Sequence, residues 1–113
     1  MKKYVLLLLV TLFSFSAEAQ EKKNKNAKYD VEVRGNCGMC KKRIEKAAFG
    51  VSGVRSATWD AKTEKLSLIL DEEKTSVEAV EKAVAGAGHD TENVKATQSD
   101  YESLHKCCKY SRE

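Results

Sequence analysis

Apolar and polar residues alternate along three stretches of this chain with the period of two that is typical of half-buried strands. The first stretch covers 29–34, the second 56–59 and the third 66–70. Their apolar positions, which would share one face of a sheet, are Tyr29, Val31 and Val33, then Ala57 and Trp59, then Leu66, Leu68 and Leu70. The pattern therefore predicts three strands that each bury one side.

Two further stretches have the period of a helix. In the first, over 41–48, Ile44, Ala47 and Ala48 mark an apolar face. The second follows Ser76, a favourable N-cap residue, and its inward positions are Val77, Val80, Val84 and Ala87. Glycines end both helices. A short fourth strand is predicted over 91–96.

The predicted order is strand, helix, strand, strand, helix, strand, which is the split βαβ arrangement of ferredoxin-like folds. We expect an α+β domain over 29–96, with two helices on a four-stranded antiparallel sheet. The segment 97–113 follows it as a tail that begins with a helical pattern and ends in a short Cys-containing stretch.

The N-terminal residues have the features of a secretory signal. Two lysines precede an apolar run over 4–15, and Ala17-Glu18-Ala19 fits a cleavage site. The run is too short for a spanning helix, although an uncleaved anchor is the alternative. We expect residues 1–19 to be removed, 20–28 to form a flexible polar leader, and the protein to be periplasmic or secreted, with no membrane span after cleavage.

Charge and composition exclude several functions. Removing residues 1–19 lowers the formal charge of the 113-residue chain from +3 to +2, because that stretch holds two lysines and one glutamate. This dispersed charge does not indicate a nucleic-acid partner. The sequence contains no Ser-His-Asp set, phosphate-binding glycine loop or paired-carboxylate signature. We therefore do not expect an enzyme, unless the cysteines act in redox chemistry.

Cys37-Gly38-Met39-Cys40 carries the clearest chemical signal. It lies on an exposed loop where a strand gives way to a helix, and a helix N-terminus stabilises the thiolate form. Two thiols at this spacing can hold one soft metal ion, act as a thiol-disulfide oxidoreductase centre, or close a small structural disulfide. The chain has no proline, so it lacks the cis-proline that faces a thioredoxin active site.

The motifs together resemble the heavy-metal-associated domain family, which includes copper chaperones, ATPase N-terminal domains and mercury-binding proteins. The resemblance rests on Gly35-Asn-Cys-Gly-Met-Cys40, Lys42-Arg-Ile-Glu-Lys-Ala47, Val51-Ser-Gly-Val54, the Trp59-Asp60…Lys65-Leu66 hairpin and Ala87-Gly-His-Asp90. It implies that Cys37 and Cys40 are the metal-binding pair. Copper(I) is then the expected ion, with mercury(II) or zinc(II) as alternatives. The expected partner is a metal-transporting membrane protein or another metal-binding domain.

Two positions depart from the family pattern. Gly35 stands where the family usually has Met, and His89 where it usually has Tyr, Phe or Lys. In the expected topology, the loop that leads into strand four lies beside the loop that leaves strand one. His89 is therefore a further candidate metal ligand, and the alternative is an exposed loop residue.

Cys107 and Cys108, preceded by His105, form a second cluster that the family resemblance does not cover. The segment from Ala96 to Cys107 is long enough to return to the first pair. We expect Cys107 and Cys108 to lie near Cys37 and Cys40, as further metal ligands or as a reversible disulfide lock. A disulfide within the tail and thiols that link to a partner are the alternatives. The sequence thus predicts an exported protein that captures and transfers a soft metal ion.

Overall fold

The computed structural model describes residues 23–112. The predicted signal peptide lies outside this range. The secondary-structure elements are β1 (Ala27–Glu32), α2 (Gly38–Phe49), β2 (Val54–Asp60), β3 (Lys65–Leu70), α3 (Val77–Gly86), α4 (Gln98–Glu102) and the single 3-10 turn η1 (Lys106–Cys108). No helix among these residues is long and apolar enough to cross a membrane.

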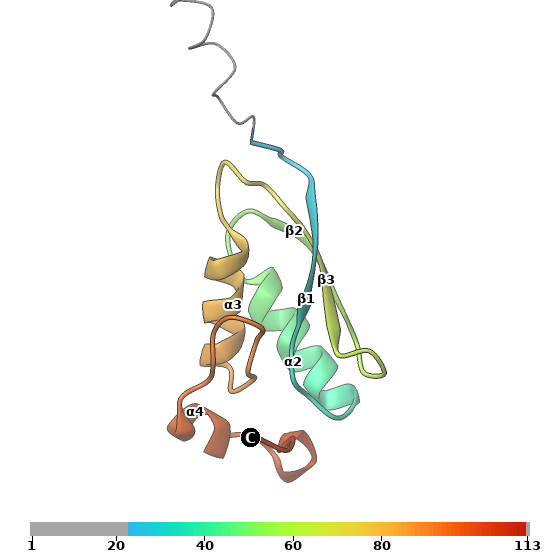
Figure 1. Ribbon diagram of the computed structural model, residues 1–113, viewed down its shortest axis with the longest axis vertical. Coiled ribbons are helices and arrows are strands. Elements are labelled where there is room, and N and C mark those ends of the chain that lie inside the picture. The colour runs from blue at the N-terminus through green and yellow to red at the C-terminus, as the bar shows by residue number, and fades with distance from the viewer. Residues whose placement is uncertain (1–22, 113) are drawn as a thin grey trace, which may run out of the picture.

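The three strands form an antiparallel sheet in the order β1-β3-β2. The central strand β3 places Leu66 opposite Val31 on one side and opposite Trp59 on the other. All three side chains are buried. Helices α2 and α3 cover this face of the sheet (Figure 1). The period-of-two pattern of the sequence therefore identified the three strands and most of the core face, but Tyr29, which was also expected on that face, is exposed.

The predicted fourth strand over 91–96 is wrong. In the described part of the chain, this segment contributes only one isolated bridge, between Val33 and Thr91. A tight turn follows, in which the Thr91 amide donates to the Val94 carbonyl at 2.8 Å. The buried Glu81 carboxylate holds the turn, because it accepts from the Thr91 hydroxyl and the Asn93 amide, each at 2.8 Å. Hydrogen bonds from a side chain thus replace a continuous β-ladder.

The unusual glycine before the cysteine pair makes room for a tryptophan. A Cβ atom on Gly35 would lie 3.0 Å from the indole ring of Trp59 and 3.2 Å from the Cβ of Cys40. The indole N–H donates to the Val33 carbonyl at 3.0 Å, so the ring is fixed beneath the loop. Gly35 and Trp59 together set how closely the loop approaches the sheet.

The C-terminal segment folds back across the end of the molecule where α2 begins (Figure 1). Tyr110 anchors it. The buried Tyr110 hydroxyl donates to the Gly88 carbonyl at 2.9 Å and accepts from the Asp90 amide at 2.7 Å. The Arg112 guanidinium reaches both Asp90 carboxylate oxygens at 3.0 Å. The tail is therefore docked on the 88–90 segment through paired polar groups.

Gly88 allows this close approach. Its φ of +104° is in the left-handed region that favours glycine, and a Cβ there would lie 2.7 Å from the Asp100 carbonyl and 2.9 Å from the Leu104 side chain. A substitution at Gly88 thus both strains the backbone and pushes α4 away.

Gly88→Ala should lower the free energy of unfolding by about 2–4 kcal/mol, through backbone strain and overpacking. Gly86→Ala is the matched control, because a Cβ at Gly86 meets nothing within 4 Å. This control should raise stability by ~0.5–1 kcal/mol, as expected for Gly to Ala in a helix. Urea denaturation of both variants measures the difference. Equal stabilities would show that the tail does not press on Gly88.

Candidate metal centre

The cysteine pair lies at the start of α2, not on an exposed loop as the sequence analysis expected. The helix begins at Gly38, with Cys37 as its N-cap, so Cys40 belongs to the first turn and has no exposed surface. Of the described side chains, none caps this helix by a hydrogen bond, and the first turn carries no acidic residue. Its free N–H groups are therefore available to the sulfur atoms.

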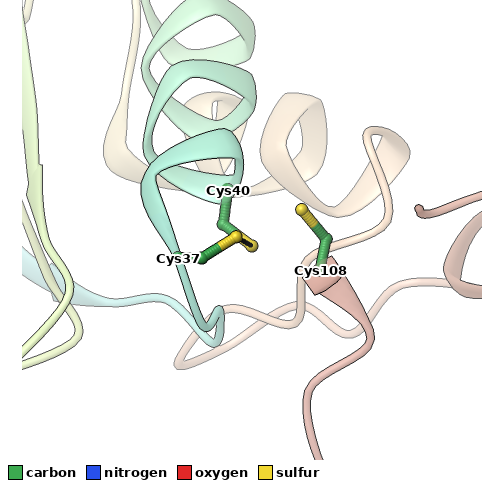
Figure 2. Close-up of side chains that lie close together, drawn as sticks. All are labelled: Cys37, Cys40 and Cys108. Carbon is green, nitrogen blue, oxygen red and sulfur yellow. Dashed lines mark hydrogen bonds between the residues drawn. The ribbon is translucent and has the colours of Figure 1, made fainter. Parts of the chain in front are cut away.

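Three thiols converge at this helix start. The Cys37 and Cys40 Sγ atoms are 3.7 Å apart. The Sγ of Cys108, from η1, joins them, and the three sulfur atoms lie within 4.8 Å of one another. Figure 2 shows the three side chains pointing toward a common centre, two from α2 and one from the C-terminal segment. The structure thus places one cysteine of the tail beside the Cys37–Cys40 pair.

The neighbouring Cys107 is not one of these three converging thiols, although its thiol comes close enough to that of Cys37 to raise the pKa of Cys107. Its side chain is exposed, and its thiol donates to the Met39 sulfur at 3.5 Å. The Cys107 backbone carbonyl instead contacts the loop: it accepts from the Asn36 side-chain amide at 3.4 Å and from the Cys37 thiol at 3.6 Å. Adjacent cysteines therefore have different surroundings, one inside the cluster and one at its edge.

The helix start changes the acidity of the thiols. The nearby backbone amide of Cys40 is the main reason that the pKa of Cys37 falls to about 7, against the partial burial of the side chain, and the Met39 amide adds to it. Burial raises the pKa of Cys108, and its neighbour Cys40 raises it further. At neutral pH the site therefore offers one thiol that is about half ionised beside a thiol that stays protonated without metal.

His89 is neither an exposed loop residue nor a member of the thiol cluster in the described chain. Its side chain has no exposed surface. The ring Nδ1 lies 2.8 Å from the Arg34 carbonyl, and the ring stacks on Tyr110 with centroids 5.8 Å apart. The alternative of an exposed loop position is wrong, because the docked tail covers this loop. The other histidine, His105, is exposed.

Sequence reasoning missed the residues that hold the tail in place. Tyr110, Asp90 and Arg112 fit no apolar period, and their partners are far away along the chain. The available signals were Asp90, at the end of the 87–90 motif, and an aromatic side chain at position 110 among polar neighbours. A lone tyrosine of this kind does not reveal which backbone groups it will bind.

Comparison with known proteins gives a consistent result. The family model described as the heavy-metal-associated domain matches residues 26–90. Copper-transporting ATPase 2 of Rhizobium meliloti (strain 1021) is 32% identical over 71 residues, which span 62% of this chain but only 9% of the ATPase. The likeness therefore concerns one domain of a much longer protein.

Solved structures show the same fold. The CopZ metallochaperone is 29% identical, with a TM-score of 0.56, over 57% of this chain and 98% of its own. Oxidized MerP from Ralstonia metallidurans CH34 is 30% identical, with a TM-score of 0.56, over 58% of this chain and 93% of its own. The family match ends before α4 and η1, so it does not include the segment that carries Cys108.

Cys37 should be the first cysteine to react with iodoacetamide in the reduced, metal-free protein, and its rate should rise with a midpoint near pH 7, because the thiolate is the nucleophile. Cys108 should stay unreactive over the same range, because its thiol is buried and its pKa is raised. Peptide mass spectrometry after timed alkylation measures each site separately. A midpoint for Cys37 above pH 8 would contradict the proposed effect of the helix amides.

The buried His89 should make stability depend on pH. Burial lowers its pKa below the ordinary 6.5, so the unfolded chain takes up a proton at a higher pH than the folded chain does. The free energy of unfolding should therefore be highest above pH 6.5 and fall as the pH drops through 6.5 toward the lower folded-state value. Denaturant titration at several pH values measures this. His89→Gln should flatten the profile in that window, whereas His105→Gln, at an exposed site, should not.

Proposed function

Since this chain belongs to the heavy-metal-associated domain family, we propose that it binds copper(I) through Cys37 and Cys40 and passes the ion to another metal-binding domain. The ion is cargo, and it is transferred by exchange of thiolate ligands. We also propose that residues 1–19 are a signal peptide and that the protein is exported, so that the transfer takes place in the periplasm or outside the cell.

One observation carries the proposal. The two sulfur atoms lie 3.7 Å apart at an uncapped helix start, and the pKa of Cys37 is about 7. A thiolate is therefore available at neutral pH without metal. Less free energy is then needed to deprotonate the sulfur that forms the first bond to copper. The edge of the site at Cys37 and Met39 is partly open to solvent, so an incoming partner has access to the ion.

The donor atoms select the class of metal. Thiolate sulfur favours copper(I) and other soft ions over magnesium or calcium. Structural zinc usually takes four ligands, whereas the described cluster provides three sulfur atoms. Mercury(II) shares the preference for few sulfur ligands and stays as the second cargo to be tested. CopZ is named a metallochaperone and the Rhizobium relative a copper-transporting ATPase, which supports copper and a partner of that kind.

The alternative is a thiol-disulfide oxidoreductase that uses the same pair. A low thiol pKa suits that chemistry as well. Membership of a metal-binding family favours the carrier, and so does the third thiol close to the pair. Turnover separates the two functions: reduction of insulin above a small-thiol control, abolished by Cys40→Ser, would favour the oxidoreductase.

Cys37→Ser and Cys40→Ser should each weaken copper(I) binding by about a hundredfold or more, because each removes a thiolate that a hydroxyl does not replace. Competition with a chromophoric copper(I) chelator under anaerobic conditions measures the affinity. Cys107→Ser is the matched control, because this exposed thiol points at Met39. It should bind copper as the wild type does.

Circular dichroism checks that the variants fold. Cys37 is partly exposed, so its replacement by serine should leave the fold unchanged. Cys40 is fully buried, so its replacement by serine is the change more prone to destabilise the fold. Tight binding retained in a folded Cys37→Ser, Cys40→Ser double variant would move the metal site elsewhere. This result would overturn the proposal.

A further inference from the structure

The third thiol of the cluster is that of Cys108, and the role given to it here rests on the proposed function. We propose that Cys108, carried by the C-terminal segment, is a third sulfur ligand of the metal, so that the tail closes the Cys37–Cys40 site into a three-coordinate centre within one molecule. The segment lies outside the matched family domain, so this ligand would be a property of this chain rather than of the family fold.

The sulfur positions fit three-fold coordination. With a metal–thiolate bond of ~2.3 Å, three sulfur atoms around one ion are ~4 Å apart, and two in a linear arrangement are ~4.6 Å apart. The observed Cys37–Cys40 distance is 3.7 Å, and all three sulfur atoms lie within 4.8 Å of one another. The pair alone would thus hold an ion at a bent angle with one side open. Cys108 points into that side (Figure 2).

The tail is positioned for this role by contacts that do not involve the metal. Cys108 is 1% exposed, and two residues later Tyr110 makes its two hydroxyl hydrogen bonds to the 88–90 segment. On the other side, the Cys107 carbonyl accepts from the Asn36 amide. Cys108 is therefore fixed from both flanks, and little conformational entropy is lost when it binds an ion.

Binding of copper(I) by the three thiols requires no oxidant or reductant. Each thiol that ligates exchanges its S–H bond for a copper–sulfur bond and releases a proton to solvent, while copper stays at +1. Three thiolates and one copper(I) ion carry two negative charges. This charge lies at the N-terminus of α2, where the backbone N–H groups and the helix dipole favour an anion.

X-ray absorption of the copper-loaded, full-length protein tests the ligand count directly. The protein is reduced with a phosphine that is removed under anaerobic conditions before copper is added, because a small thiol or a remaining phosphine would itself bind copper(I). We expect three sulfur neighbours in the wild type and in Cys107→Ser, but two in Cys108→Ser. Copper(I) affinity in Cys108→Ser should fall by about tenfold or more, as expected when a metal site loses a supporting group. Native mass spectrometry should show one ion in a monomer.

The outcomes separate this inference from the proposed function. Two sulfur neighbours in the wild type would overturn the third ligand and leave the Cys37–Cys40 carrier standing. Copper shared between two protein molecules would overturn the intramolecular site. Loss of the third sulfur in Cys107→Ser but not in Cys108→Ser would show that Cys107, not Cys108, is the third ligand, and would overturn the proposal. No copper(I) binding by the wild type would overturn the carrier and the third ligand together.

Discussion

The docking of the C-terminal segment on residues 88–90 is the constraint on which the thiol cluster depends. The Tyr110 hydroxyl is buried, yet both its donor and its acceptor functions are satisfied, by Gly88 and Asp90. A buried hydroxyl that lost these partners would cost about 1–3 kcal/mol. Asp90 also accepts from the Ala96 amide at 2.8 Å, so one carboxylate ties the tail to the turn before it. Asp90 therefore links the tail to the turn that stands in place of the predicted fourth strand.

The two long helices show how the helix start is adapted to the thiols. In α3, the Ser76 side chain caps the helix and Glu78 lies in the first turn. In the described part of α2, neither feature is present, although a cap is typically worth ~1 kcal/mol. Because no cap occupies them, the backbone amides at this helix start are available to lower the pKa of Cys37. The absence of a cap is therefore part of the chemistry of the site.

The sequence predicted the elements whose residues repeat with a clear period. The three strands, both long helices and the Ser76 cap were found this way, because an alternating or helical pattern directly reports which side is buried. The 91–96 segment was misjudged. Its conformation depends on Glu81, a charged residue on a helix that sequence reasoning treats as exposed, although it is 2% exposed here.

The candidate site was predictable in part. The Cys37–Cys40 spacing and the reach of the tail indicated where thiols would meet, but not which tail cysteine would turn inward. In the 3-10 turn η1, Cys108 is the buried residue and Cys107 stays exposed. For His89 the sequence offered a metal ligand or an exposed loop residue, and no local pattern revealed that Tyr110, from 21 positions later in the chain, stacks on it.

A third sulfur ligand on a separate segment changes what limits transfer. Two thiolates from one helix start leave the ion accessible, so an incoming thiolate binds before either of them dissociates. When Cys108 occupies the third position, the incoming thiolate must displace it. The segment is held by polar contacts at Tyr110 and Arg112, and Leu104, Cys108 and Tyr110 are buried in the core cluster. With Cys108 as a third ligand, the tail would retain the ion in the isolated protein, and a partner that competes for Cys108 would favour release.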